Sequence, residues 1–267
     1  MMRQKDCAQD ESKINVGIHL YKHITMLDVY GPLQFFNAVD EFCHFTFSED
    51  GEPVESDSGI DLLPTYGFYN CPDIDILVVG GTGDVLSQLT QLKCKKDKRY
   101  TQENPLEFLR EKGEKAQYVT SVCTGAFILA EAGLLDGYKA ATYWAYSELL
   151  NRYPNVTPVD ERVCIHRNRI TGGGVTAGMD FALVVILEVL SKLYENDTCK
   201  NYDPKFFALE QVKRTQLSLE YRPERRFNYT PDNSPETAHE LRRHMSEKYE
   251  WDKIRQHIDG NTIDGNT

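Results

Sequence analysis

The residue best placed for chemistry in this sequence is a cysteine between an apolar strand and an apolar helix. Cys123 follows Tyr118–Val122 and precedes Gly125–Leu135. A nucleophile at such a junction needs small residues two positions away on either side, because the chain turns sharply, and Ser121 and Gly125 supply them. The positive end of the helix would point at the sulfur, which predicts a lowered thiol pKa and a reactive thiolate. A small buried cysteine that merely ends a strand is the alternative interpretation.

Two polar side chains are candidate helpers of this cysteine. Thr124 follows it directly, and its hydroxyl could bind a substrate or water, although threonine at a helix start is also a common cap. Asp28 follows the first predicted strand, at the carboxyl edge where open parallel sheets bind their ligands. An aspartate beside a Gly-Pro turn can also be a cap. Near a thiolate, burial and like charge would raise the pKa of the aspartate and make it a proton carrier.

A glycine-rich loop reaches the same edge of the predicted sheet. Gly80-Gly81-Thr82-Gly83 follows the apolar stretch Ile74–Val79. Glycines let backbone amides approach a ligand closely. The loop lacks the lysine and the spacing of a P-loop, so it does not predict nucleotide binding.

The elements that must position these residues alternate between strands and helices. The predicted strands are 14–20, 42–47, 74–79 and 118–122, with a hairpin or strand pair over 163–171. The predicted helices are one beginning at Pro32, then 104–115, 125–135 and 179–193. This alternation predicts an α/β fold, a doubly wound parallel sheet with helices on both faces.

Composition narrows the range of partners. The formal net charge is −11 and 40% of the residues are hydrophobic, which favours a globular domain and argues against a general nucleic-acid or anionic-membrane surface. We therefore expect a small-molecule substrate and no nucleic acid. We also expect no membrane span, because no apolar run approaches the ~20 residues that one needs. The amino-terminal residues lack the pattern of a signal peptide, which predicts a cytoplasmic protein. The seven cysteines are scattered without a C-x-x-C, so we expect neither a disulfide framework nor a metal site.

Three segments lie outside the predicted core. We expect a disordered N-terminus over 1–13, a solvated basic loop over 93–99, and a C-terminal extension over 222–267, with the main domain spanning 14–221. The extension carries apolar residues at helical spacing between Pro235 and Ile258, which predicts one amphipathic helix packed on the domain or on a second subunit. The end, 258–267, is a short direct repeat that we expect to be frayed.

Taken together, these motifs resemble the ThiJ/PfpI superfamily, over roughly residues 16–193. The resemblance is carried by the turn at 27–32, the strand and loop at 75–83, the cysteine junction and 171–183. A narrower similarity to isonitrile hydratases lies in four stretches, 118–135 (YVTSVCTGAFILAEAGLL), 144–150 (WAYSELL), 170–183 (ITGGGVTAGMDFAL) and 217–221 (LSLEY), and continues into the tail at Phe227-Asn228 and Ser234-Pro235.

This resemblance implies a fold, an activity and roles for residues. The fold would be flavodoxin-like, with the cysteine at a nucleophile elbow. The activity would be the cofactor-free addition of water to an organic isonitrile, giving an N-substituted formamide through a thioimidate. Cys123 would be the nucleophile, Asp28 the acid/base and Thr124 an assisting residue. The substrate-binding residues implied are Gly81, Thr82, Tyr143 and Trp144, and the protein would be a homodimer.

Departures from related patterns keep alternatives open. Protease-like relatives carry histidine after the cysteine, where this chain has Thr124, and glyoxalase-type relatives place glutamate where Asp28 stands. Isonitrile hydratases tend to have histidine before the tryptophan, where this chain has Tyr143. The alternatives are a glyoxalase or deglycase acting on 2-oxoaldehydes, and a non-enzymatic redox sensor in which Cys123 is oxidised. AraC-type regulators carry a similar domain, but the acidic charge and short tail argue against DNA binding.

Overall fold

A mostly parallel seven-stranded sheet forms the centre of the structure, which is a computed structural model that describes residues 10, 12–94, 104–195, 203–223 and 230–263. The strand order is β10-β11-β7-β6-β1-β2-β5. Only the edge strand β10 runs antiparallel, in a hairpin with β11. The strands of this sheet are β1 (Ile14–His19), β2 (Phe42–Ser48), β5 (Tyr66–Gly67), β6 (Ile76–Val79), β7 (Tyr118–Val122), β10 (Val163–His166) and β11 (Arg169–Gly172). Two small sheets pair β3 (Val54–Glu55) with β4 (Asp61–Leu62) and β8 (Tyr138–Ala140) with β9 (Val156–Pro158).

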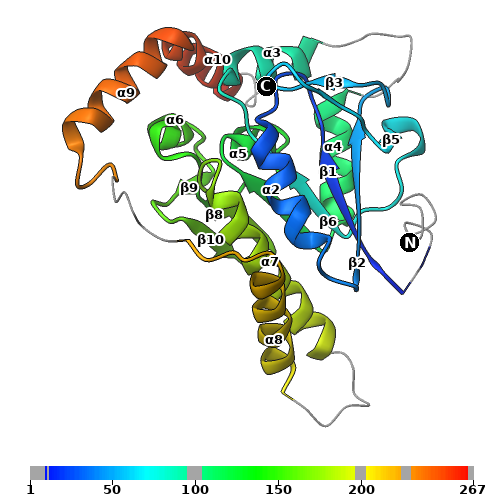
Figure 1. Ribbon diagram of the computed structural model, residues 1–267. Coiled ribbons are helices and arrows are strands. Elements are labelled where there is room, and N and C mark those ends of the chain that lie inside the picture. The colour runs from blue at the N-terminus through cyan, green and yellow to red at the C-terminus, as the bar shows by residue number, and fades with distance from the viewer. Residues whose placement is uncertain (1–9, 11, 95–103, 196–202, 224–229, 264–267) are drawn as a thin grey trace.

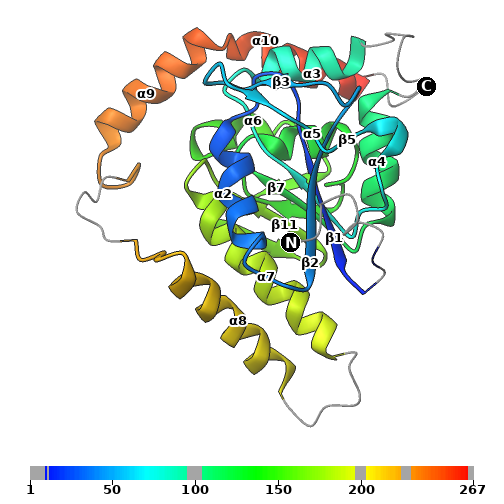
Figure 2. The same ribbon diagram turned by 45° about the vertical axis from the view of Figure 1, so that its right-hand side comes forward.

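Helices cover both faces of the sheet (Figures 1 and 2). One face carries α2 (Met26–Phe36) and α7 (Ala177–Glu195), with α8 (Pro204–Ser218) packed outside α7. The other face carries α3 (Val85–Cys94), α4 (Pro105–Lys115) and α5 (Gly125–Glu131). Short helices η1 (Phe68–Asn70), η2 (Trp144–Tyr146) and α6 (Ser147–Leu150) lie in the connections, and the chain ends in α9 (Pro235–Lys248) and α10 (Trp251–Ile263). This arrangement confirms the predicted doubly wound α/β sandwich.

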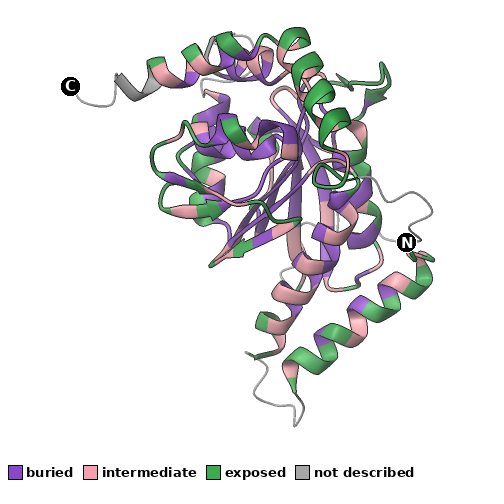
Figure 3. Cartoon of the chain, turned by 90° about the vertical axis from the view of Figure 1, so that its left-hand side faces the viewer, coloured by how far each residue is buried: buried purple, intermediate pink, exposed green. Residues whose placement is uncertain are grey.

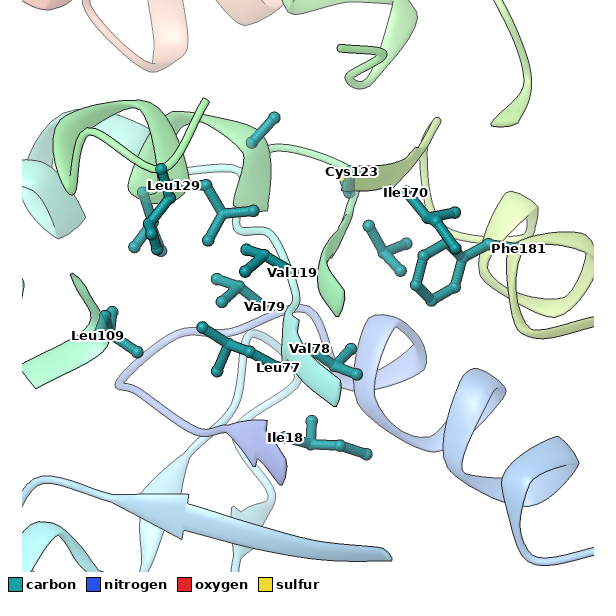
Figure 4. Packing of buried hydrophobic residues seen from close by; sticks show 14 of the residues in the cluster. Ile18, Leu77, Val78, Val79, Leu109, Val119, Cys123, Leu129, Ile170 and Phe181 are labelled. Atoms are coloured by element: carbon teal, nitrogen blue, oxygen red, sulfur yellow. The ribbon is translucent and has the colours of Figure 1, made fainter. Parts of the chain in front are cut away.

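The central strands are apolar on both sides because each side faces a layer of helices. In β6, Leu77 and Val79 point toward the helices that carry Leu109 and Leu129, and Val78 points the opposite way (Figure 4). Successive strand residues alternate between faces, so a strand covered twice needs an unbroken apolar run. Most residues of the parallel strands are buried, whereas the outer surfaces of α8 and α9 are exposed (Figure 3).

The first helix begins earlier than predicted. It starts at Met26 and contains Pro32, so the prediction of a helix beginning at Pro32 is wrong. The missed start signal comes from far along the chain, because the Asp57 carboxylate accepts a hydrogen bond of 3.1 Å from the Met26 amide. Pro32 is buried inside this helix, close to α7, where a Cβ added on Gly178 would lie 3.4 Å from the proline ring.

The C-terminal extension also differs from its prediction. Two helices, α9 and α10, replace the single helix expected from Pro235 to Ile258, because the backbone turns at Glu250, whose φ is 48°. The buried apolar residues gather in α10, where Trp251, Ile254 and Ile258 join the core. The extension therefore packs on the domain, one of the two arrangements predicted for it.

Some predictions concern residues that the structure does not describe. The expected disorder of residues 1–13 and the loop expected over 93–99 fall mostly outside the described residues. The prediction of a frayed end over 258–267 is wrong for residues 258–263, which continue helix α10, and residues 264–267 lie outside the described residues. The described helices include none with the length and apolar character needed to cross a membrane. Helix α8 was not among the predicted elements, although its last residues belong to the LSLEY stretch.

The first residue of α5 provides a test of this packing. A Cβ on Gly125 would collide with the backbone carbonyl oxygen of Val79, so we expect Gly125→Ala to lower the free energy of unfolding by several kcal/mol (about 2–4) as strand and helix separate. Chemical denaturation measures the loss. The matched control is Gly260→Ala in α10, where a Cβ meets nothing within 4 Å, and alanine should be neutral or stabilising by up to about 1 kcal/mol. Equal stability of the two variants would contradict the packing described.

Candidate active site

Cys123 lies at the turn between β7 and α5 with its backbone in the left-handed region. Its φ is 58°, which is uncommon for a residue with a side chain. Its amide donates to the carbonyl oxygens of Gly172 (3.1 Å) and Gly173 (3.0 Å), and its own carbonyl accepts from the Thr142 hydroxyl at 2.9 Å. These bonds hold the turn in place, and the side chain is buried at the carboxyl end of the sheet. The sharp turn predicted at Cys123 is present.

Asp28 lies near Cys123 at the carboxyl edge of the sheet, although it belongs to α2, which follows β1, whereas Cys123 follows β7. Strand β1 pairs with β2 on one side and β6 on the other, and the segments that follow β1 and β6 lead to helices on opposite faces of the sheet. Asp28 lies in the helix after β1 and accepts a hydrogen bond of 2.8 Å from the amide of Gly81, in the loop after β6. Its Oδ1 is buried and has no hydrogen-bond partner among the described residues, and electrostatic coupling links the carboxyl group to the Cys123 thiol. A carboxyl group and a thiol are thus neighbours at the carboxyl edge of the sheet.

The burial of this pair controls its protonation. Burial raises the pKa of Asp28 to about 7, against the opposing effect of the hydrogen bond from Gly81. Burial, followed by the charge of Asp28, raises the pKa of the Cys123 thiol well above its ordinary value, although the amides of Thr124 and Val175 act to lower it. The prediction of a lowered thiol pKa is therefore wrong, because desolvation outweighs the pull of backbone amides at this turn.

Thr124 holds the glycine-rich loop against the elbow. Its hydroxyl accepts a hydrogen bond from the Thr82 amide and donates one to the Thr82 carbonyl, both at 2.7 Å. The one proton of this hydroxyl is thus committed to the protein backbone. Thr124 is a positioning residue in this arrangement, tying the β6 loop to the residue next to Cys123.

Gly81 is packed too tightly for any side chain. A Cβ on Gly81 would lie 2.5 Å from the Thr124 nitrogen and 2.8 Å from the Cys123 Cβ. Its amide is engaged with Asp28 and its carbonyl accepts from the amide of Thr25 at 2.8 Å. Of the predicted substrate-binding residues, Gly81 and Thr82 thus lie beside the cysteine. Gly81 packs against Cys123 and bonds to Asp28, and Thr82 bonds to Thr124.

Tyr143 and Trp144 lie on the other side of the cysteine, in a surface groove of about 650 Å³. Tyr143 packs directly onto Gly174, and burial raises its pKa above the ordinary value. Trp144 carries the guanidinium of Arg242 over its ring at 5.3 Å. Cys123 and Asp28 are not among the residues that line this groove, which meets the elbow through Thr142, Gly173 and Val175.

Several residues of the site escaped sequence reasoning. Val175 has a φ of 42° and an amide near the sulfur, a position that the Gly172–Gly174 run hinted at without specifying. Tyr21 donates a hydrogen bond of 2.7 Å to the Gly80 carbonyl, and Tyr249 from the extension lies against Gly83. These contacts join segments far apart in the chain, so no local pattern indicates them.

Comparison with known proteins identifies the family of this chain. The model of the DJ-1/PfpI family matches residues 15–188, which contain the whole sheet except the first residue of β1. This chain belongs to the DJ-1/PfpI family. The matched region includes Cys123, Asp28 and the loop between β6 and α3.

The individual relatives carry names of different functional classes, an enzyme and transcriptional regulators among them. An isonitrile hydratase of Pseudomonas putida is 33% identical over 225 residues, covering 84% of this chain and 85% of that protein. The HTH-type transcriptional regulator GbdR of Pseudomonas aeruginosa is 29% identical over 185 residues, which are 67% of this chain and 47% of the regulator. A solved ThiJ/PfpI family protein from Pseudomonas syringae superposes with a TM-score of 0.76 at 29% identity, covering 93% of this chain and 91% of that one. DJ-1beta of Drosophila melanogaster shares the fold, with a TM-score of 0.57 at 17% identity over 78% of this chain and 98% of that one.

The hydroxyl of Thr124 can be tested through stability. Thr124→Val keeps the shape of the side chain but leaves the buried amide and carbonyl of Thr82 unpaired, so we expect a loss of about 2–4 kcal/mol in the free energy of unfolding. Thr124→Ser retains the hydroxyl and should lose about 1 kcal/mol or less. Urea denaturation compares them, with exposed Thr157→Val as the control. A Thr124→Val variant as stable as the wild type would contradict the positioning role.

The burial of Asp28 predicts an unusual dependence of stability on pH. Because its pKa rises from 3.8 to about 7 on folding, the unfolded chain releases the proton first, and this residue's contribution to stability is lost as pH rises from about 4 to about 7. Asp28→Asn removes the effect, so relative to wild type it should gain stability, on the order of a few kcal/mol, between pH 4.5 and pH 8. Denaturation at both pH values measures this, with exposed Asp40→Asn as the control. Parallel curves for Asp28→Asn and wild type would contradict a buried, protonated Asp28.

Proposed function

We propose that this protein is a cofactor-free hydratase that adds water to a small organic isonitrile and releases an N-substituted formamide. The observation that carries the proposal is the buried contact between a thiol and a carboxyl group whose pKa is about 7. Similarity to the Pseudomonas putida isonitrile hydratase over most of both chains supports the choice of substrate.

The first step would form a covalent thioimidate. As the Cys123 sulfur bonds to the terminal carbon of the isonitrile, the thiol proton passes to the Asp28 carboxylate and from there to the same carbon, giving R–N=CH–S–Cys123. Both the sulfur and the proton add to one carbon, so the carboxyl must stand beside the sulfur, as Asp28 does. The thiol is neutral at rest, and it would become nucleophilic only as Asp28 takes its proton.

The second step would hydrolyse this intermediate. Asp28, again a carboxylate, takes a proton from water while the water oxygen attacks the thioimidate carbon, and the nitrogen accepts the proton. Collapse of R–NH–CH(OH)–S–Cys123 breaks the carbon–sulfur bond, returns a proton to sulfur and releases R–NH–CHO. The amides of Thr124 and Val175 stabilise the sulfur as it regains negative charge. Water and isonitrile are the only reactants consumed.

Two alternatives remain distinguishable by assay. A glyoxalase or deglycase would turn over methylglyoxal, whereas the proposed hydratase would turn over cyclohexyl isocyanide. A non-enzymatic redox sensor would turn over neither substrate and would gain oxygen at Cys123 in mild peroxide. Burial and the raised pKa of the thiol oppose the sensor, because thiolate character and exposure promote oxidation.

Substitution of the pair tests the proposal. Cys123→Ala should produce no formamide above the uncatalysed rate, because the nucleophile is gone. Asp28→Asn should lower kcat/KM by about 10²–10⁴-fold, the usual contribution of a proton carrier. The matched control is Cys164→Ala, a buried free cysteine in the edge strand β10, which should keep wild-type activity. Full formamide production by folded Cys123→Ala would overturn the proposal.

The pH profile provides an independent check. Thiol activation needs Asp28 as a carboxylate, so kcat/KM should rise with pH through about 7 and level off above it. Steady-state kinetics between pH 5.5 and 8.5 measure the profile. A rate that falls over this range would show that protonated Asp28 is the active form and would contradict the first step.

A further inference from the structure

The C-terminal extension meets the candidate site at Tyr249, the residue that follows α9 as its C-cap. A Cβ on Gly83 would lie 2.7 Å from the Tyr249 hydroxyl oxygen and 2.9 Å from its Cζ, so the phenol ring end fills the space beside this glycine. Gly83 continues the loop whose Gly81 and Thr82 contact Asp28 and Thr124. In both ribbon views α10 lies at the top of the molecule beside α3, the helix that follows this loop (Figures 1 and 2).

Tyr249 is held in place by the helix that follows it. Trp251, two residues later, is 2% exposed and packs 4.9 Å from the ring centre of Tyr146. Arg152 pairs with the Asp259 carboxylate through its Nε and Nη2 atoms, and Arg255 pairs with Glu148 of α6. The extension therefore stands in a defined position over the site.

Three tyrosines connect the extension to the cysteine. Tyr146 donates a hydrogen bond of 2.8 Å to the Gly83 carbonyl, and its ring centre lies 6.1 Å from that of Tyr143. Tyr143 follows Thr142, whose hydroxyl donates a hydrogen bond to the Cys123 carbonyl, and Gly83 lies two residues after Gly81, which abuts Cys123. Tyr143, Tyr146 and Tyr249, which we call the tyrosine roof, thus form a chain of contacts through Gly83 from the extension to the segments that flank Cys123.

We propose that Tyr249 is a specificity-determining residue, which closes the roof over Cys123 and limits the size of the group attached to the reacting carbon. The identity of the substrate as an isonitrile rests on the function proposed above, whereas the size limit is a property of the roof. The family fold would thus supply the cysteine and the carboxylate, and the C-terminal extension would select among substrates by bulk.

Alkylation of Cys123 tests the roof without any catalytic turnover. Iodoacetamide is compact and N-phenylmaleimide is bulky, and mass spectrometry of the Cys123 peptide gives the rate for each at one pH. Tyr249→Ala should raise the ratio of the bulky to the compact rate about tenfold, the scale on which pocket size discriminates. Tyr249→Phe keeps the ring and should keep the wild-type ratio. The matched control is Tyr69→Ala, an exposed tyrosine beside the edge strand β5.

Turnover then tests the link to substrate choice. The kcat/KM for 2,6-dimethylphenyl isonitrile relative to methyl isonitrile should rise about tenfold in Tyr249→Ala and stay unchanged in Tyr249→Phe. Tyr249→Leu, which retains apolar packing, should give an intermediate ratio if Tyr249→Ala melts early. Circular dichroism and the melting temperature check that each variant is folded.

The outcomes separate the two proposals. If no variant hydrates either isonitrile but the alkylation ratio rises in Tyr249→Ala alone, the roof stands and the isonitrile assignment fails. If hydration occurs but both ratios stay at the wild-type value in folded Tyr249→Ala, the size limit is overturned. An equal rise in both alkylation rates, with an unchanged ratio, would also overturn it, because that result reflects general loosening of the extension.

Discussion

The contact between the Asp28 carboxyl and the Cys123 thiol imposes the constraint on which the rest of the site depends. Both groups are buried, and each would be costly as an isolated charge. The protein offsets part of this cost with three amides, from Gly81 toward the carboxylate and from Thr124 and Val175 toward the sulfur. These amides belong to loops after β6, β7 and β11, so the carboxyl ends of three strands must be in register before the pair can exist.

This constraint explains why glycine and threonine surround the site. Gly81 has no room for a side chain because its amide must reach Asp28 while its backbone lies against the elbow. Thr124 uses its hydroxyl on Thr82, which keeps the same loop at a fixed distance from Cys123. Residues that local reasoning interprets as ligands for a substrate are here the support of the reacting pair. Tyr143 and Trp144 differ from them, because they line the groove and can meet a substrate.

The sequence was sufficient for the sheet and for the position of the elbow, since both depend on local patterns. Apolar runs identified β1, β2, β6 and β7, and β7 has the predicted bounds. It was insufficient where a distant contact decides the outcome. The carboxylate of Asp57 starts α2, the turn at Glu250 divides the extension, and desolvation reverses the predicted shift in the pKa of Cys123. Each of these depends on segments that only the folded chain brings together.

Relatives of this chain include a protein named as an enzyme and proteins named as transcriptional regulators. Because the shared domain does not distinguish them, the segments that cover the carboxyl edge of the sheet are of interest. The structural match to the Pseudomonas syringae protein covers 93% of this chain and must include part of the extension, because residues 222–267 make up more than the remaining 7%. A thiolate is costly in the protein interior, and here Cys123 is 5% exposed and its neighbour is a carboxyl group. The burial that protects Cys123 from side reactions therefore also keeps its thiol neutral until a base such as Asp28 takes the proton.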